Sequence, residues 1–585
     1  MPLHQLTTTL SHWPHLLLDP TTTTMLYMTV LISSLVYTYT IPYLKYTQTH
    51  PLPYLIYWLL SIIIMLWLIV ANSALSIFIA WELLGLSSYL CIYYPHQNSA
   101  TNNASTQAWL IGKWGSCALL TGLLMMQVGI GEFNITTLAI DPPNMQPNLW
   151  TNTAATCIVL GLITKSAQFP FCSWLPKAMV APTPTSALLH TATMVSAGLY
   201  LLIRMYPLLP QAILTLITIT GAITALLGAS AALTQRSLKR MLAYATLSQL
   251  GYMMMTIGVG GSSVCLPYLV YHALAKSCML LCAGSIACYT QQQGNVHTQD
   301  MHLMGRLHRH IPWIWVAYSL STWALLGLPG ASVSKATMLA YTLRWAQIQQ
   351  PLGYLVPIIG TCVVVLTAAY LIRSYGLIFM GLPRWKKVST ALGTPPTNNS
   401  LSIGLQLPPL ALALCTVGLA YGIGSPFGLC HSPSILSDLA IQQLATRLVR
   451  GSTIVGVAVG IWGLRSRVEI SWQPYRLLRN LAFDGWYLER VIQVITKLVW
   501  GLSRGIRVVE ERVMMGVVRQ LAVGVVVVGH VVHALDKCLV DGVKGFIGGM
   551  GRRIGRGYKR VQDGDVQGYF WWTCVGVGVM MVFGF

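Results

Sequence analysis

Seven ionisable side chains lie within otherwise apolar stretches of this 585-residue sequence. They comprise one acid, four lysines and two histidines: Glu82, Lys113, Lys165, Lys276, Lys335, His190 and His272. An ionisable group at bilayer depth costs about 2.5–3.5 kcal/mol on insertion scales, so such groups usually persist because they bind or move charge. The set therefore predicts a path for protons or other ions.

Lys165 lies close to two prolines, Pro170 and Pro176, that interrupt an apolar run. A proline-broken helix at membrane depth frees backbone carbonyls, which can line a wet cavity. A second break, Gly327–Ser334, directly precedes Lys335. Two broken helices of this kind resemble the inverted-repeat plan of transporters.

The other ionisable residues have spacings that suit a relay. His272 and Lys276 are one helical turn apart, so both side chains can face one cavity. The imidazole of His190 titrates in a range that suits proton transfer near neutral pH. Simpler explanations also exist: an interface-facing carboxyl at Glu82, a core histidine at 190 and a headgroup lysine at 335.

The composition sets the class of protein. Hydrophobic residues make up 54% of the chain and charged residues 9%, whereas soluble domains carry about 25% charged residues. The sequence therefore predicts an all-α polytopic membrane protein of about fourteen transmembrane helices. The expected spans lie near 24–44, 53–71, 74–94, 106–130, 153–172, 185–206, 211–233, 241–260, 264–288, 311–334, 352–380, 402–424, 451–466 and 568–585.

The net charge of +21 does not indicate nucleic-acid binding, because no basic run is interleaved with aromatic residues in the manner of such proteins. Basic loops fit the positive-inside bias and anionic lipid instead. The thirteen cysteines show no paired spacing, so neither a zinc nor an iron–sulfur site is expected, and no metal or cofactor is predicted for this chain. The first residues also lack the basic region of a secretory signal.

The tail differs from the rest of the chain, because charges recur every few residues from about Trp472 to Arg560. This pattern predicts a long amphipathic helix that lies along a surface; the alternative is a short extra span at Val517–Val532. The predicted organisation is amino-terminal spans (1–94), an antiporter-like core (95–380), additional spans and a loop (381–470), a lateral helix (471–566) and a terminal transmembrane anchor (567–585).

Several motifs together resemble one known family. They are Trp81-Glu82, Lys165–Gln168, Trp174–Pro176, Pro182–Pro184, Ser186–His190, Ala243–Gly251, His272-Ala273 with Lys276, and Ser334-Lys335. This set resembles chain 5 of NADH-ubiquinone oxidoreductase, the distal antiporter-like subunit in the membrane arm of respiratory complex I. In the tail, Phe483–Tyr487 and Leu535–Lys537 are similar to the family's lateral helix.

The resemblance implies roles for the ionisable residues. Glu82 and Lys165 would form the charge pair of the inner half-channel. His190 and Lys276 would continue the central relay, and Lys335 would be the terminal lysine of the outer half-channel. His272 and Lys113 would have secondary roles.

The resemblance also implies partners and a location. FMN, iron–sulfur clusters and ubiquinone chemistry would reside on partner subunits. The lateral helix would contact neighbouring antiporter-like subunits of the membrane arm. The expected location is the mitochondrial inner membrane, with a bacterial plasma membrane as the alternative.

The sequence departs from the family pattern at several positions. The residues that replace the usual ones are Cys172, Val180, Lys113, Ser116, Tyr268 and Ala336. In addition, Leu18–Pro20 normally follows two earlier spans, so we expect helices of another chain, or tightly held lipid, against residues 24–71. The alternatives are an Mrp-type sodium/proton antiporter subunit and a structural membrane-arm subunit with no conducting path.

Overall fold

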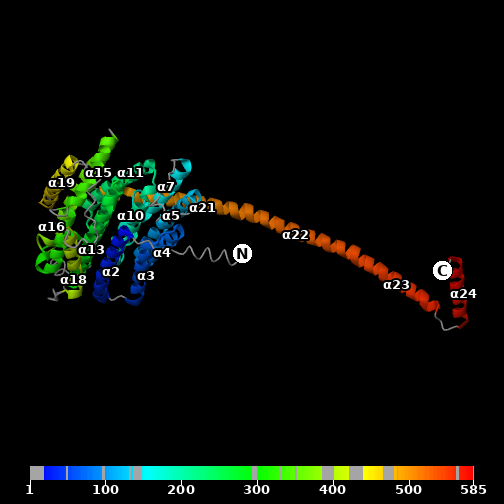
Figure 1. Cartoon of the computed structure of the whole chain (residues 1–585). Helices are drawn as coiled ribbons and strands as arrows, with labels where there is room; N and C mark the ends of the chain where they lie inside the picture. The colour runs from blue at the N-terminus through cyan, green and yellow to red at the C-terminus, as the bar shows by residue number, and fades with distance from the viewer. Residues whose placement is uncertain are drawn as a thin grey trace. The chain divides into compact units, whose positions relative to one another are not determined.

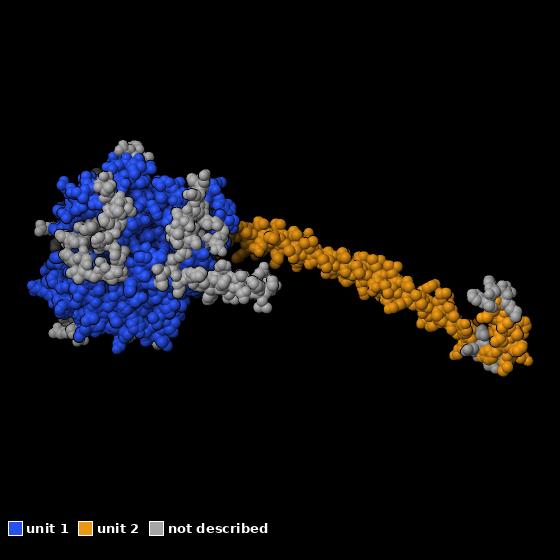
Figure 2. Space-filling model, in the orientation of Figure 1, with its two compact units in different colours: residues 1–489 blue, residues 490–585 orange. Residues whose placement is uncertain are grey.

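The computed structural model describes most of the chain. The described residues are 19–47, 51–94, 99–130, 134–135, 148–292, 299–327, 332–349, 352–384, 401–420, 439–465, 480–483, 485–561 and 566–583. Their secondary structure is helical, and the only β-type pairs among them are two isolated bridges. The chain divides into two compact units, residues 1–489 and 490–585 (Figure 2).

Unit 1 is a bundle of helices that pack side by side (Figure 1). Its helices are α2 (Pro20–Thr47), α3 (Pro51–Val70), α4 (Ala74–Tyr93), α5 (Ser99–Ile130), α7 (Leu149–Lys165), α8 (Trp174–Ala178), α9 (Thr183–Leu189), α10 (Met194–Met205), α11 (Gln211–Thr234), α12 (Leu238–Gly258), α13 (Ser262–Gln292), α14 (Pro312–Leu326), α15 (Ser332–Ile348), α16 (Leu355–Phe379), α18 (Ile403–Ala420) and α19 (Leu439–Arg465). Short 3₁₀ turns are η1 (Tyr206–Leu208), η2 (Met301–Leu303), η3 (Leu307–Arg309), η4 (Leu352–Tyr354) and η5 (Gly485–Tyr487).

Within the described residues, ten helices are long and apolar enough to cross a membrane by length and composition. This confirms the all-α membrane fold. The expected span 311–334 is instead two helices, because α14 ends where Gly327 adopts a left-handed conformation and α15 begins at Ser332. Residues 328–331 of this second break lie outside the described residues.

The first break is fully described. The expected span 153–172 ends as a helix at Lys165, and the positive φ of Ala167 then turns the chain out of the α7 axis. The chain re-enters helical structure at α8 and again at α9. Lys165 is therefore the last residue of a helix rather than a residue in mid-span, as the two prolines predicted.

Glycines allow α11 and α12 to pack closely, and this helix pair makes the largest contact in the bundle. A methyl group at Gly251 of α12 would meet the backbone of Ala225 on α11, and one at Gly221 of α11 would meet the backbone of Met255. Small residues that let helix backbones approach in this way are typical of membrane bundles, where apolar surface alone gives little driving force. This contact fixes α12, which carries residues of the site described below.

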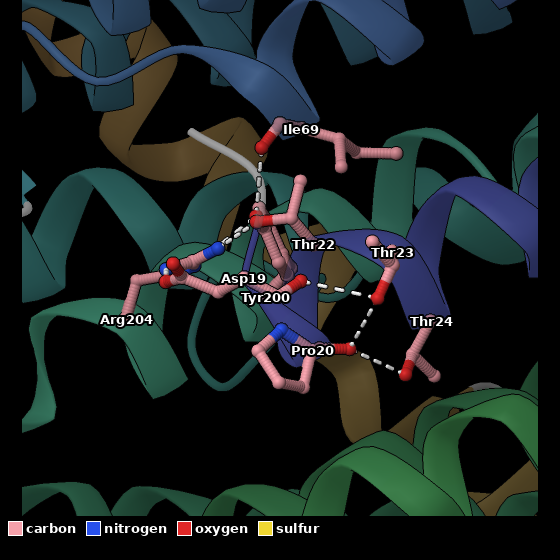
Figure 3. Close-up of polar contacts among 8 residues, drawn as sticks. All are labelled: Asp19, Pro20, Thr22, Thr23, Thr24, Ile69, Tyr200 and Arg204. Atoms are coloured by element: carbon pink, nitrogen blue, oxygen red, sulfur yellow. Dashed lines mark hydrogen bonds and ion pairs between the residues drawn. The ribbon is translucent and has the colours of Figure 1, made fainter. Parts of the chain in front are cut away.

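A buried arginine joins three helices near one end of the bundle (Figure 3). Arg204, near the end of α10, forms an ion pair of 2.6 Å with Asp19 at the start of α2. It also donates to the hydroxyls of Thr22 and Tyr200, and the Tyr200 hydroxyl donates to the carbonyl of Ile69 on α3. The side chain of Arg204 is 6% exposed and that of Asp19 is 43% exposed.

Unit 2 is dominated by one continuous helical run. It comprises α21 (Leu488–Val509), the π-turn η6 (Glu510–Met514), α22 (Met515–Asp536), the π-turn η7 (Lys537–Asp541) and α23 (Gly542–Val561), followed by α24 (Val566–Phe583). The predicted long tail helix is thus confirmed, and it reaches about 110 Å at the rise of an α-helix. The alternative short span, Val517–Val532, lies within α22, and the helical run Trp500–Arg560 is apolar enough in part to cross a membrane. That this run lies along a surface therefore stays a prediction.

Candidate functional site

Glu82 on α4 and Lys113 on α5 form a salt bridge. The Glu82 side chain is 22% exposed and that of Lys113 is 44% exposed. The other carboxylate oxygen of Glu82, Oε1, is buried and has no hydrogen-bond partner within the described residues. The pair opens onto a small hollow lined by Glu82, Gly85, Ala108, Trp109, Gly112, Lys113, Ser116, Lys165 and Met194.

Lys165 reaches this hollow from the end of α7 and is 1% exposed. Its ammonium donates to the carbonyl of Trp81 and lies 4.0 Å from the centroid of the Trp81 ring. Gly85 leaves room for this approach, since a Cβ there would be 3.7 Å from the lysine Nζ. A side chain larger than alanine at 85 would compete for the space of the ammonium.

The pairing at this end differs from the expected one. The resemblance implied a charge pair between Glu82 and Lys165, but the hydrogen-bonded partner of Glu82 is Lys113. Lys165 remains within electrostatic range of both side chains. The carboxylate therefore lies between two lysines, one bonded to it and one held nearby by a carbonyl and an indole ring.

His190 lies at the end of α9 and is 1% exposed. Neither ring nitrogen has a hydrogen-bond partner among the described residues. The ring centroid is 6.2 Å from that of Trp174, whose indole donates to the carbonyl of Thr164, next to Lys165. His190 therefore lies beyond Lys165 along the interior of the bundle.

Lys239 is a buried lysine that the sequence reasoning missed. It is 4% exposed, lies in the first turn of α12, donates to the carbonyl of Ala181 and interacts electrostatically with His190. The predicted span began at residue 241, which left Lys239 in a loop. The sequence did contain a signal for an earlier helix start. An apolar run follows Lys239 directly, and Ser237, two residues before it, is the N-cap residue of α12.

His272 and Lys276 lie one turn apart on α13, as the spacing predicted, and are 2% and 0% exposed. Within the described part of the chain, no hydrogen bond reaches either imidazole nitrogen or the Lys276 ammonium. The ammonium lies 5.9 Å from the centroid of the Tyr370 ring on α16. His272 interacts electrostatically with Lys276 and Lys335.

Lys335 lies in the first turn of α15 and is 3% exposed. Its ammonium donates to the carbonyl of Leu325 at the end of α14. Lys165 and Lys335 share one feature, since each lies at a helix break and donates to a backbone carbonyl, although Lys165 ends the helix before its break and Lys335 begins the helix after its own.

Tyr268, which stands where the family usually has histidine, keeps a polar group beside His272. Its hydroxyl donates to the Gln249 side chain at 2.5 Å, and the Gln249 amide donates to Thr367 at 3.1 Å. The rings of Tyr268 and His272 have centroids 6.2 Å apart. At position 268, a hydrogen-bonded network of Tyr268, Gln249 and Thr367 thus stands where the resemblance implies a histidine ring.

These residues form an ordered set of buried bases. Electrostatic interactions connect Glu82 with Lys165, His190 with Lys239, and His272 with Lys276 and Lys335. None of the four buried lysines has a salt-bridge partner within the described residues, nor do these residues contain a cluster of three or more metal-ligating side chains. A membrane helix bundle with broken helices and unpaired internal bases is an ion-translocating protein of the antiporter type.

Comparisons with known proteins define the family. The model "NADH:quinone oxidoreductase/Mrp antiporter, TM" matches residues 71–362. NAD(P)H-quinone oxidoreductase subunit 5 from the chloroplast of Nephroselmis olivacea is 32% identical, covering 86% of this chain and 80% of the relative. Chain 5 of the corresponding enzyme from Picosynechococcus is 31% identical, covering 86% of this chain and 77% of the relative. The chain belongs to the subunit 5 family of NAD(P)H-quinone oxidoreductase.

A solved structure is also similar. A chain of the Mrp complex from Dietzia shares 28% identity and a TM-score of 0.64. The match covers 88% of this chain and 56% of that chain. The predicted family is therefore confirmed, and the antiporter-like fold is shared with the Mrp branch.

Proposed function

We propose that this chain is the proton-translocating, antiporter-like subunit of an NAD(P)H-quinone oxidoreductase, with protons crossing the membrane by way of its buried bases. The observation that carries the proposal is a set of six buried bases that have no carboxylate partner within the described residues: Lys165, His190, Lys239, His272, Lys276 and Lys335. Each buried charge is costly unless it is used. Lysine and imidazole can both lose and regain a proton, which suits a relay.

The geometry at Glu82 suggests how charge could be passed on. The carboxylate is bonded to Lys113 but remains within electrostatic range of Lys165. Movement of Glu82 towards Lys165 would stabilise the lysinium, and movement towards Lys113 would favour proton release from Lys165. The released proton would pass to His190 and Lys239, and then to the His272, Lys276 and Lys335 group, with water bridging the gaps.

The redox chemistry belongs, in this proposal, to partner subunits. FMN, the iron–sulfur clusters and the quinone would be bound elsewhere in the complex, and this chain would convert the released energy into proton transfer. The contacts would be with adjacent antiporter-like subunits, along the helical run from Leu488 to Val561. This assignment of the cofactors to partners is tested by asking whether the chain copurifies with flavin-bearing subunits in one complex.

The location is proposed to be the mitochondrial inner membrane, on the basis of the resemblance to the ubiquinone-reducing chains. The relatives named above are chloroplastic and cyanobacterial, so a photosynthetic membrane is the competing location. Fractionation of the source cells, followed by detection of the chain with an antibody, distinguishes the two.

The experiment that tests the relay replaces one lysine at a time in the purified complex, reconstituted into vesicles. Lys165→Met and Lys276→Met keep the length of the side chain but remove the titratable group. We expect several-fold less proton pumping per quinone reduced, with the complex still assembled. Lys177→Met, on α8 next to the first break, is the matched control. Pumping at the control level in both variants would contradict the relay.

The Mrp likeness favours a second candidate, a sodium/proton antiporter subunit. The long helical run of unit 2 argues for the oxidoreductase, because the motifs of this tail resemble the lateral helix of chain 5. Sodium-dependent proton movement in vesicles without any quinone reaction would favour the Mrp alternative. Quinone-dependent pumping without sodium would favour the oxidoreductase.

A further inference from the structure

The short helix α9 lies in the middle of the relay and cannot fix its own position. It has seven residues, Thr183–Leu189, and turns separate it from α8 before it and from α10 after it. In a helix this short, many of the backbone N–H and C=O groups belong to the end turns and have no partner within the helix. The position of α9 therefore depends on its contacts with neighbouring helices.

Both ends of α9 lie next to bases of the relay. His190 directly follows the last residue of the helix. At the other end, the carbonyl of Ala181, two residues before the helix, accepts a hydrogen bond from the Lys239 ammonium at 3.3 Å. His190 and Lys239 also interact electrostatically. A shift of α9 would therefore change the positions of these two bases relative to each other.

Two tyrosines from other helices bond to the first turn of α9. The hydroxyls of Tyr54 on α3 and Thr185 on α9 hydrogen-bond each other at 2.7 Å. The hydroxyl of Tyr43 on α2 lies 3.3 Å from that of Thr183, and it accepts from the Thr183 amide at 3.5 Å. The N-cap residue of α9 is Pro182, which has no side-chain acceptor, so Tyr43 takes part of the capping role.

These hydroxyl contacts are enclosed within the bundle. The side chains of Tyr43, Tyr54, Thr183 and Thr185 are all buried. A buried hydroxyl that loses its partner has no water to replace it, so breaking such a bond is costly. Helix α13 also closes in on α9, since a Cβ at Gly284 would come within 2.6 Å of the Thr183 side chain. The first turn of α9 is thus held between α2, α3 and α13.

We propose that Tyr43 and Tyr54 are positioning residues of the relay. Their hydroxyls hold the first turn of α9, so that His190 and Lys239 keep the geometry that proton transfer between them requires. The hydrogen bonds of the two hydroxyls go to α9 rather than to a base, so the tyrosines act through the helix. This inference rests on the proposed function, because it assumes that protons pass between His190 and Lys239.

The test removes single hydroxyls in the purified complex, reconstituted into vesicles. Tyr54→Phe keeps the ring but loses the bond to Thr185, and Tyr43→Phe should act in the same direction. We expect several-fold less proton pumping per quinone reduced, with the complex still assembled, because small misplacements of reacting groups slow transfer strongly. The matched control is Tyr318→Phe. The Tyr318 hydroxyl is equally buried and makes a bond of the same kind, 3.0 Å to Ser374, between α14 and α16.

Substitutions at Thr185 separate positioning from a general loss of stability. Thr185→Val has a similar shape without the hydroxyl and should lower pumping as Tyr54→Phe does, whereas Thr185→Ser keeps the hydroxyl and should pump normally. Tyr54→Phe combined with Thr185→Val should lower pumping no further than either change alone, because both remove the same bond. Amide hydrogen exchange of residues 183–190 should be faster in Tyr54→Phe than in Tyr318→Phe, since it reports the local opening of α9.

The outcomes distinguish this inference from the proposed function. Normal pumping in Tyr43→Phe and Tyr54→Phe, alongside reduced pumping in Lys165→Met, would overturn the positioning role and leave the relay intact. Normal pumping in Lys165→Met as well would contradict the proposed function, and the inference with it. Equal losses of pumping in Tyr54→Phe and Tyr318→Phe would assign the effect to the stability of the bundle and would also overturn the positioning role.

Discussion

Lys239 is the residue for which the structure adds most to the sequence. It is buried beside His190, between the first break and the His272–Lys276 group, and its ammonium donates to the carbonyl of Ala181. The adjacent Arg240 is exposed, although the two basic residues are neighbours in sequence. Because Lys239 is buried and Arg240 is exposed, the structure distinguishes a candidate relay residue from a surface residue, which the sequence alone could not do.

We predict that Lys239→Met lowers proton pumping per quinone reduced several-fold and leaves assembly unchanged. The reason is that methionine fills the same buried space without a group that can take up a proton. Pumping of reconstituted vesicles is the measurement, and Arg240→Met is the control one residue away. An equal effect of the two substitutions would assign the loss to the basic loop rather than to the relay.

Much of the candidate site could be predicted from the sequence, because an ionisable residue in an apolar run is conspicuous. Lys165, Lys276 and Lys335 are all buried, as expected. The partner of Glu82 could not be predicted, since it depends on which face of α5 meets α4. That contact places Lys113 against the carboxylate and leaves Lys165 on the carbonyl of Trp81.

At the scale of helices, the ion pair between Asp19 and Arg204 joins α2 to α10 (Figure 3). Its two partners differ in exposure, so their removal should differ in cost. Without Asp19 a buried guanidinium keeps its charge with no counter-ion. Without Arg204 the carboxylate can be hydrated, because it is 43% exposed.

We therefore predict that Asp19→Asn destabilises the chain more than Arg204→Met does. The expected loss for Asp19→Asn is about 1–3 kcal/mol, reduced from the cost of a fully buried pair because Asp19 is partly exposed. Thermal unfolding of the purified complex in detergent is the measurement, and the double variant gives the coupling between the two residues. The reverse order of stabilities would show that the hydrogen bonds of Arg204 to Thr22 and Tyr200 outweigh the charge effect.

The packing of α11 on α12 gives a second prediction at this scale. Gly251→Ala places a methyl group against the backbone of Ala225, and a helix backbone cannot yield as a flexible side chain can. We expect a loss of about 1–3 kcal/mol, the range for overpacking, seen as a lower unfolding temperature. Gly112→Ala is the control, because a Cβ there has no atom within 4 Å. Equal stability of both variants would mean that the helices can separate at little cost.

Helix positions were easier to predict than helix breaks. Apolar runs of about 20 residues are visible in the sequence, and α3, α4 and α16 lie where they were expected. The second break, Gly327–Ser334, was predicted, but the expected span 311–334 ran through it, since the run stays apolar through Gly327. The structure adds the physical reason, because Gly327 adopts a left-handed conformation that ends α14.

At the scale of the whole molecule, the chain comprises two compact units, the helix bundle of residues 1–489 and the helical unit of residues 490–585 (Figure 2). Residues just before the boundary are fixed to the bundle. The Trp486 indole donates to Ser230 on α11 at 3.0 Å, and the amide of Gln235 donates to the carbonyl of Phe483 at 3.0 Å. Unit 2, by contrast, leaves long runs of valine and other apolar side chains exposed in this chain alone.

Exposed apolar surface on this scale marks an interaction site with protein or lipid. The lateral-helix prediction assigns it to neighbouring subunits, and the short-span alternative assigns part of it to the bilayer. Removal of unit 2 should then weaken the attachment of this chain to its neighbours more than it disturbs the fold of the bundle. The anchoring contacts of Phe483 and Trp486 provide a natural point for the truncation, because they stay with the bundle.

We predict that a chain ending at Tyr487 folds as a bundle but associates more weakly with the rest of the complex. The expected result on native gels is a smaller complex without this chain, with its bundle recovered separately at a near-normal unfolding temperature. Gly549→Ala, within α23 and with open space around the added methyl group, is the control for expression of the full-length form. If the truncated chain instead assembles in full yield and the complex cannot pump, the helical run transmits conformational change, and its proposed role in attaching subunits is wrong.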